Sequence, residues 1–373
     1  MTPARMDRAR DAGPEPEGRA TIQVRPRPRA GSMVVVVSAL SIVLVLAIAV
    51  ATAYGTVTIE VSTVARVIGH QIFGSVVTPD FTPIDEQIIW RLRLPEVLLA
   101  AVIGAGLSVV GATLQAVVRN PLADPYLLGV SSGAGFMAAM VITLGSATVA
   151  GLSASGAAFV GALLSTVLVL AIAAGPGGRF APVRVVLAGV TLSFFFLGLT
   201  NYLIFHSSDP NAATAVLFWL LGSLTGASWP TLWLPAVVVA LGTVYLQAQG
   251  RSLNAVVVGE ETALSAGIDV RAFRLRMLVV TSLITGVMVA AAGGIAFVGL
   301  VVPHVVRLLV GPDHRRGLPV SALAGAIFVV LVDLMCRVAV SPNVLPLGIV
   351  TSLVGAPFFL WLLRRSRTGA MAG

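Results

Sequence analysis

The strongest constraint on this chain is a succession of long apolar runs between residues 33 and 363. A helix that crosses a bilayer needs about 20 consecutive, predominantly apolar residues. Ten runs come close to this length, at Met33–Ala53 and approximately at 95–118, 126–146, 150–173, 184–206, 229–248, 275–296, 297–311, 318–340 and 345–363. Charged residues make up 11% of the chain, against about 25% in soluble domains. We therefore predict an all-α integral membrane protein with about ten transmembrane helices.

The N-terminal region divides into a polar tail and a first apolar run. Residues 1–30 carry seven arginines, four acidic residues and several prolines without apolar periodicity, so a disordered tail is expected. The run Met33–Ala53 ends in Ala51-Thr52-Ala53, which resembles a signal-peptidase site. A cleaved signal is thus the rival interpretation, but the run exceeds the roughly 7–15 residues of a signal core, which favours a spanning helix. The membrane domain is placed at 31–368 and a short tail at 369–373.

Every one of the 24 basic residues is an arginine, and the chain contains no lysine. A phosphate-binding P-loop needs its lysine, so a Walker-type ATPase site is excluded. With the N-terminus inside, ten spans place 20 of the 24 arginines in the cytoplasm and leave Arg66, Arg91, Arg93 and Arg337 outside. The positive-inside rule therefore supports ten spans with both termini cytoplasmic, and the arginines indicate topology rather than nucleic-acid binding.

A polar segment broken by proline and glycine, 119–135, lies between two apolar runs. Irregular backbone and charge are tolerated at membrane depth only where they face protein or a water-filled path. This segment therefore indicates contact with a solute rather than simple anchoring. Polar residues inside the runs, among them Gln115 and His304, more often make hydrogen bonds between helices than bind ligands.

The connection at 249–274 reads as two short helices with Gly259 between them. Glu260 and Glu261 would open the second helix, where acidic residues favour the helix dipole, and Gly267 would end it. The segment either packs on its own bundle as an interfacial loop or projects as a docking element for a cytoplasmic partner.

Asp333 and Arg337 are four residues apart and share one face of the ninth run. A proton-coupled carrier would use such an acid, but the arginine would hold it ionised, which favours a structural or docking role. Asp, Glu and His show no metal-ligand spacing, Cys336 is the single cysteine, and no nucleophile is paired with a base. We therefore expect no catalytic residue and no cofactor bound by this chain.

Several motifs occur in a characteristic order, and the set is more specific than any member. They are Arg93-Leu94-Pro95, Gly111 with Gln115, Arg119–Pro125, Leu128–Gly135, Leu187–Val190, Gly259-Glu260-Glu261, Phe297–His304 and Gly355–Phe359. Together they closely resemble the FecCD-type permease family, the membrane subunits of ABC importers for iron-siderophores, haem and vitamin B12. The resemblance covers about residues 88–365.

The resemblance implies a type II ABC importer-like bundle in a bacterial inner membrane, paired with a second permease copy or a paralogue. Two cytoplasmic ATPase subunits, which bind ATP and Mg²⁺, would dock on 253–267, and an extracytoplasmic binding protein would deliver an iron chelate. Haem and cobalamin are rival cargoes. The implied ATPase-coupling residues are Asn254, Gly259, Glu260, Glu261 and Gly267. The implied translocation path and gate include Gln115, Asn120, Pro121, Asp124, Ser131, Ser132, Pro182 and Val183. Arg93 and Arg337 would contact the binding protein.

The chain departs from the family pattern at three positions. Glu96 stands where a second motif arginine is usual, Val344 where a glutamate is usual, and Leu264 where the coupling segment usually has an arginine. The spacing of Gly111 and residues 117–119 is similar to that of Gly299 and residues 305–307. This weak internal similarity allows an inverted repeat of five plus five spans.

An ion-coupled carrier and a membrane-embedded enzyme are the rival classes of protein, and both lack the residues they would need.

Overall fold

The computed structural model describes residues 30–370 except 77, 79 and 175–181, and it is built from helices. The long and medium helices are α1 (Ala30–Ala53), α2 (Val61–Phe73), α4 (Leu94–Val118), α5 (Val130–Leu144), α6 (Ala154–Ala173), α7 (Pro182–His206), α9 (Trp229–Ala248), α12 (Val270–Ala292), α13 (Val298–Val310), α14 (His314–Val338) and α15 (Leu347–Ala370). The shorter helices are α3 (Pro83–Glu86), the π-helical η2 (Gln87–Arg93), η3 (Pro125–Leu128), α8 (Ala212–Leu221), α10 (Gly250–Val258) and α11 (Glu260–Ser265). The predicted N-terminal tail lies outside the described residues, apart from Ala30 in α1.

The ten predicted spans correspond to ten helices of the described chain. Seven helices are long and apolar enough to cross a membrane: α1, the continuous α3–α4, α6, α7, α9, α12 and α14. The other three predicted spans form the shorter apolar helices α5, α13 and the first part of α15. A further apolar helix, α8, has ten residues. At 1.5 Å per residue it is about 15 Å long, too short to cross the hydrocarbon.

The second predicted span begins earlier than expected, since one helical stretch runs from Pro83 to Val118. Pro95 suggests a helix start at that point because proline lacks the N–H that a helix interior needs. The structure avoids this break with the π-helical turn Gln87–Arg93, in which the Leu94 N–H donates to the Ile89 carbonyl. A π-turn shifts the hydrogen-bond register just before the proline, so the helix continues outward beyond its predicted end.

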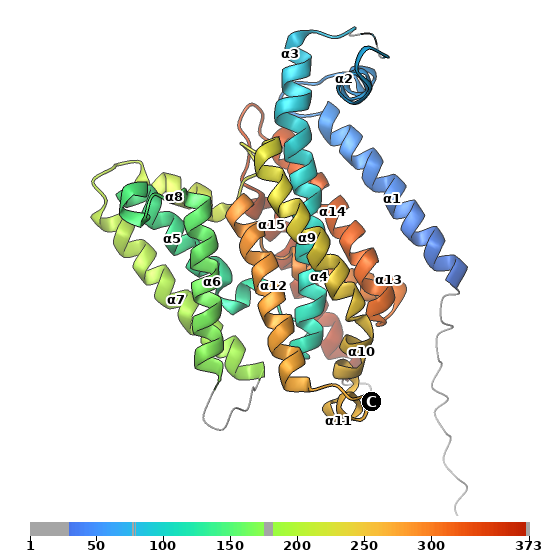
Figure 1. The fold of residues 1–373 in the computed structure, drawn as a ribbon, viewed down its shortest axis with the longest axis vertical. Helices are drawn as coiled ribbons and strands as arrows, with labels where there is room; N and C mark the ends of the chain where they lie inside the picture. Colours follow the sequence, from blue (N-terminus) through green and yellow to red (C-terminus); the bar gives the residue numbers. More distant parts are fainter. Residues whose placement is uncertain (1–29, 77, 79, 175–181, 371–373) are drawn as a thin grey trace, which may run out of the picture.

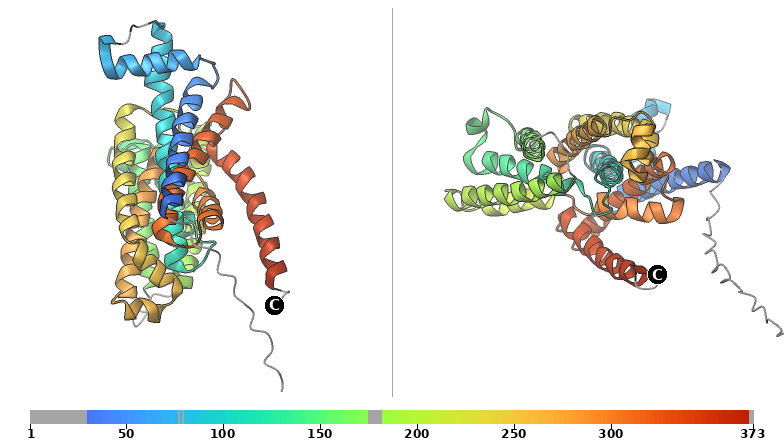
Figure 2. Two further views of the ribbon diagram at one scale, coloured as in Figure 1. Left: turned by 90° about the vertical axis from the view of Figure 1, so that its right-hand side faces the viewer. Right: turned by 90° about the horizontal axis from the view of Figure 1, so that it is seen from below.

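The core of the bundle is α4, which Figure 2 shows enclosed by later helices of the chain. Its contacts with α14 and α13 depend on glycine. A Cβ on Gly104 would lie 2.1 Å from the Gly325 carbonyl oxygen, and a Cβ on Gly111 would lie 1.9 Å from that of Gly299. Small residues that let backbones touch are the usual packing device in membranes. Helices α5 to α8 form a group beside this core, against α12 (Figure 1).

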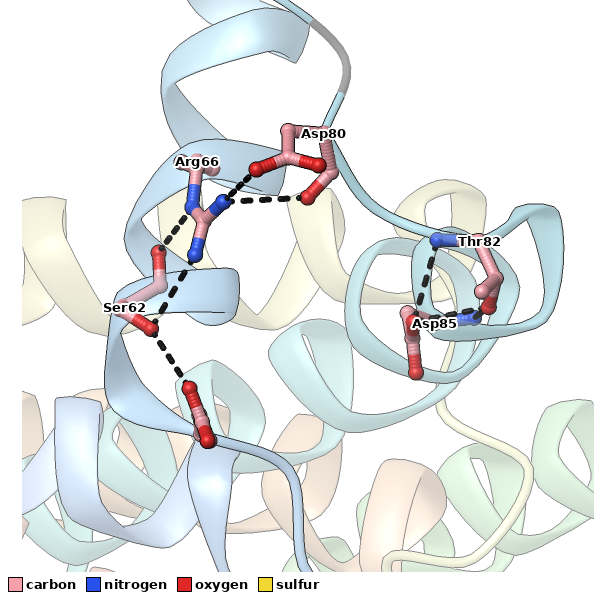
Figure 3. A network of polar contacts seen from close by, with 6 residues as sticks. Ser62, Arg66, Asp80, Thr82 and Asp85 are labelled. Atoms are coloured by element: carbon pink, nitrogen blue, oxygen red, sulfur yellow. Dashed lines mark hydrogen bonds and ion pairs between the residues drawn. The ribbon is translucent and has the colours of Figure 1, made fainter.

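The two ends of the bundle carry different short helices (Figure 1). Helices α10 and α11 project at one end, and α2 and α3 cover the other. The α2–α3 cap has its own small core, which includes Val64, Val67 and Ile89. Figure 3 shows its polar side, where Arg66 pairs with Asp80 and α3 begins with a capping box. The described residues of the connection between α1 and α4 therefore form a mostly helical element.

Candidate functional site

Two short helices form the projecting end, as the sequence predicts. Helix α10 ends at Val258, Gly259 has extended backbone (φ 165°), and α11 begins at Glu260. Gly267 has φ +75° and donates its N–H to the Leu264 carbonyl, which closes the turn after α11. Glycine adopts this left-handed conformation without a steric cost. The predicted two-helix motif, with Gly259 between the helices and Gly267 at its end, is confirmed.

The projecting helices expose apolar side chains. Val258 is 70% exposed, Leu264 61% and Val257 41%, whereas Leu253 and Ala263 on the opposite sides are buried. The buried residues hold the motif on the bundle, and the exposed ones form a small apolar surface that we call the α10–α11 knob. Leu264, one of the departures from the family pattern, adds to this surface.

Asn254, on α10, faces the bundle rather than the solvent. The Asn254 Nδ2 donates to an Asp313 oxygen at 2.7 Å, and the Asn254 Oδ1 accepts from the His314 backbone N–H at 2.9 Å and lies 2.8 Å from the His314 Nδ1. Burial acts to raise the pKa of Asp313, but hydrogen bonds from Asn254 and Arg315 and the nearby arginine charges lower it below its ordinary value. Asn254 thus joins α10 to the start of α14.

The two acidic residues of α11 differ in their surroundings. Glu260 forms a 2.7 Å ion pair with Arg274 of α12, whose side chain is buried. Glu261 is exposed. Within the described chain, Glu260 therefore ties α11 to α12, and Glu261 remains available to a partner.

The polar segment after α4 turns back into the bundle. The Asn120 Oδ1 accepts the Leu122 N–H at 2.9 Å, and an Asp124 oxygen accepts the Tyr126 N–H at 2.8 Å. The Tyr126 hydroxyl in turn accepts the Ile295 N–H at 2.8 Å. The segment contacts the connection between α12 and α13 through Tyr126, and protein covers residues 123–125, whereas Arg119 and Pro121 are exposed.

Asp124 is 8% exposed, and its second carboxylate oxygen has no hydrogen-bond partner in the described chain. Burial raises its pKa to about 6, opposed by the backbone hydrogen bond from Tyr126. The path assignment of Asp124, Asn120 and Pro121 stays a prediction.

Gln115 makes the helix-to-helix hydrogen bonds that its position suggests. Its Nε2 donates to the Gly299 carbonyl at 3.1 Å, and its Oε1 accepts from Arg307. Gln115 is 5% exposed, so it joins α4 to α13 in this conformation. This contact bridges the two segments that echo each other in the sequence.

The remaining path residues lie on two helices. Ser131 and Ser132 are half-buried at the start of α5, and Val183 is 68% exposed at the start of α7. Pro182 begins α7, and its side chain lies outside the described residues. A cavity of about 740 Å³ lies elsewhere, between α6, α9 and α12, and none of the predicted site residues lines it.

The two arginines predicted to dock a binding protein lie inside the bundle. Arg93 is 5% exposed and donates to the carbonyls of Thr52, Ala53 and Val57 at the end of α1. Arg337 is 4% exposed and pairs with Asp333 at 2.6 Å. Neither guanidinium is presented on the surface, so Arg337 does not extend to the interface as its position suggests. Their role in docking stays a prediction.

These features define a multi-pass helical membrane protein, with apolar helices packed through glycine and a projecting pair of short helices. The chain belongs to the FecCD transport family, whose model matches residues 42–365. Members are permease subunits of ABC transporters, and a separate subunit hydrolyses ATP.

Two relatives carry names that specify a cargo. The chain is 42% identical to the cobalamin import system permease protein BtuC of Halobacterium salinarum over 77% of this chain and 76% of that one. It is 39% identical to the vitamin B12 import system permease protein BtuC of Vibrio cholerae over 77% of this chain and 85% of that one. An ABC transporter permease of Bacillus subtilis, YvrB, is 40% identical over 84% of this chain and 89% of its own length.

A solved structure supports the fold. An inward-facing conformation of a metal-chelate type ABC transporter superimposes with a TM-score of 0.75 and 28% sequence identity, over 88% of this chain and 99% of that one. The type II importer bundle expected from the sequence is confirmed.

Proposed function

We propose that this permease carries cobalamin across a bacterial inner membrane, driven by two separate ATPase subunits that dock on the α10–α11 knob. The observation that carries the ATPase contact is the exposure of Val258 and Leu264 on helices whose other sides are buried. Short helices with an apolar face fit a groove on a partner. The α10–α11 end would then face the cytoplasm together with both termini, and the α2–α3 cap would face the binding protein.

The cargo proposal rests on the relatives rather than on pocket chemistry. The relatives from Halobacterium salinarum and Vibrio cholerae are named for cobalamin or vitamin B12. The iron chelate predicted from the resemblance therefore gives way to cobalamin as the first cargo to test, and a ferric siderophore and haemin become its competitors.

A second permease copy would complete the path. Helix α7 exposes Leu187, Phe194 and Phe205, and α15 exposes Leu353 and Leu360. Lipid or another apolar helix surface can cover such faces. We propose that a second copy covers part of them and that the cargo passes between the two copies.

The ATPase contact is tested by co-purification in lipid nanodiscs. Val258→Asp with Leu264→Asp places two charges on the knob without touching the buried side of the motif, and capture of the ATPase should fall at least about tenfold. Val76→Asp is the matched control, because Val76 is 83% exposed on the opposite cap. Equal capture by both variants would refute the knob as the ATPase site.

The cargo is tested by uptake into proteoliposomes that contain the chain, its ATPase and its binding protein. Labelled cyanocobalamin should accumulate only when ATP is present on the side of the membrane that carries the ATPase. Excess haemin or ferric siderophore should not compete with its uptake. Uptake of the iron compounds without uptake of cobalamin would overturn the cargo and leave the permease class intact.

A further inference from the structure

The start of α14 is held by side chains from two other helices. Asn254 of α10 contacts both Asp313 and His314, with three polar atom pairs between 2.7 and 2.9 Å. Asp313 also accepts the Arg315 N–H at 3.0 Å and so caps α14. Because one amide serves both the cap and the first residue of α14, a displacement of α10 acts directly on the end of that helix.

A second hydrogen bond, from Gln247 of α9, also holds the start of α14. Pro319 lies inside α14 and has no N–H for the Arg315 carbonyl, four residues earlier. The Gln247 Nε2 of α9 donates to this freed carbonyl at 2.8 Å. Gly250, at the start of α10, lies close to Arg315, since a Cβ there would be 3.1 Å from its side chain. The α9–α10 corner is therefore joined to α14 by polar contacts and close packing.

Helix α14 continues from this joint to the opposite end of the bundle. It is one helix from His314 to Val338, about 37 Å long at 1.5 Å per residue. Near its middle the Gly325 and Gly104 backbones touch. At its far end Arg337 pairs with the buried Asp333 at 2.6 Å. A shift at the joint is thus transmitted to the α2–α3 end.

Helix α11 has a separate attachment. Glu260 pairs with Arg274 of α12, and α12 packs on α6, where a Cβ on Gly286 would lie 3.1 Å from Ala162. Gly259, the residue between α10 and α11, bears no side chain that would tie the two together. The two halves of the α10–α11 knob are therefore connected to different helices of the bundle.

We propose that Asn254 is a positioning residue that makes α10 and α14 move as one body, so that motion of the ATPase reaches the α2–α3 end through α14. The side chain does not contact the ATPase in this assignment. It acts through Asp313 and His314, whereas α11 packs on α10 and is attached to α12 through the Glu260–Arg274 pair. This inference rests on the proposed function for the docking of the ATPase on the α10–α11 knob, and for the cargo only in the uptake assay.

A charge exchange tests the joint. Asn254→Asp places a second carboxylate where the amide donates to Asp313, and transported cobalamin per ATP hydrolysed should fall about tenfold. Asp313→Asn added to Asn254→Asp restores one amide and one carboxylate at the joint, and asparagine still caps α14. The double variant should return to within about twofold of the wild type. Ser252→Ala, on α10 and without a side-chain hydrogen bond in the described chain, is the matched control and should retain wild-type coupling.

A second readout does not depend on the cargo. Nitroxide labels on Val340→Cys and Leu144→Cys, in a Cys336→Ser background, report the separation between the far ends of α14 and α5. Both labelled residues are exposed, with Val340 just after α14 and Leu144 at the end of α5. With the ATPase bound, a non-hydrolysable ATP analogue should shift this separation in the wild type and in the double variant, and should leave Asn254→Asp unshifted.

The outcomes separate the two proposals. If the wild type shows the nucleotide-driven shift but takes up no cobalamin, the proposed cargo is wrong. The label distances still test the contact between α10 and α14. Wild-type coupling in Asn254→Asp, or a double variant no better than the single one, overturns the joint. The double variant decides even if Asn254→Asp assembles poorly, because it restores the hydrogen-bonding groups that the single variant removes.

Discussion

Helices α1 and α4 are both long and apolar, yet they have opposite places in the molecule. In its apolar window, 6% of α1 is buried inside the protein, against 78% of the window that contains α4. Helix α1 is built largely from valine, leucine and isoleucine, whereas α4 includes Gly104, Ser108, Gly111 and Gln115. Lipid tails are as apolar as leucine, so apolar surface alone does not hold a helix in a bundle.

The comparison teaches that small and polar residues, rather than hydropathy, mark the packed helix. Along α4, glycines admit two neighbouring backbones, and Gln115 bonds to α13. Helix α1 packs along α14 on one side, and at its end Arg93 satisfies the carbonyls of its last turn. A cation there also suits the helix dipole. The following variants probe this difference, beginning with the largest expected effect.

Gly111→Val should prevent the bundle from assembling. The first added carbon would lie 1.9 Å from the Gly299 carbonyl oxygen, and a backbone atom cannot move aside as a side chain can. Overpacking in ordinary cores costs about 1–3 kcal/mol, and we expect at least the upper value here. Gly198→Val is the matched control, because Gly198 lies in α7 with open space around it. Thermal unfolding in detergent measures both, and equal melting temperatures would contradict the packing role of Gly111.

Arg93→Ala should loosen the end of α1 from the bundle. The variant removes the donor for three carbonyl groups, and hydrogen bonds from charged groups contribute about 1.5–3 kcal/mol each at most. We expect a loss of about 3 kcal/mol and faster proteolysis after Ala53. Arg91→Ala, two residues away and exposed, should behave like the wild type. If Arg93→Ala instead keeps its stability but binds the binding protein poorly, the docking role predicted from the sequence is correct and the capping role is wrong.

How much of the structure can be predicted from the sequence depends on how far apart along the chain the interacting residues are. The spans and the two-helix knob follow from local patterns, namely apolar run length and the placement of Gly259, Glu260 and Gly267. Gln115 and its partner Arg307 are 192 residues apart in the sequence, and no local pattern encodes such a contact. The echo between Gly111 and Gly299 was a weak signal, and the two residues lie in contact.

The two buried arginines, Arg93 and Arg337, show the same limit of sequence analysis. A charged residue near the end of a span suggests exposure at the interface, because long side chains reach water from there. Arg93 and Arg337 instead find carbonyls and a carboxylate inside the protein. Their burial depends on how α1, α4 and α14 meet, which composition and spacing do not determine.

Asp124→Asn tests whether protein covers Asp124 in the polar segment after α4. Unlike the variants above, it should raise the free energy of unfolding. Burial raises the folded-state pKa of Asp124 to about 6, so the protonated form favours folding below about pH 4, and this contribution is lost as the pH rises through 6. The variant should therefore be about 1–3 kcal/mol more stable than the wild type at pH 7.5 and nearly equal to it at pH 4. Asparagine keeps the acceptor for the Tyr126 N–H.

Asp209→Asn is the control for this measurement, because its carboxylate accepts the Asn211 N–H in an exposed loop. Chemical unfolding at the two pH values should show no comparable gain. A destabilised Asp124→Asn at pH 7.5 would mean that the ionised carboxylate has a partner in the membrane, and the segment would then belong to a water-filled path.

The smallest effect is expected on α1 itself. Leu46 is 59% exposed and faces lipid if α1 spans the bilayer, so Leu46→Ala exchanges one lipid-facing side chain for another and should change stability by less than about 0.5 kcal/mol. Leu107→Ala in α4 is the matched variant. Leu107 is 1% exposed, and its truncation leaves a cavity that costs about 2 kcal/mol or more. Unfolding in the same detergent measures both variants. A large loss for Leu46→Ala would mean that another protein surface covers α1, and the difference between the two helices would then lie in the partner and not in their composition.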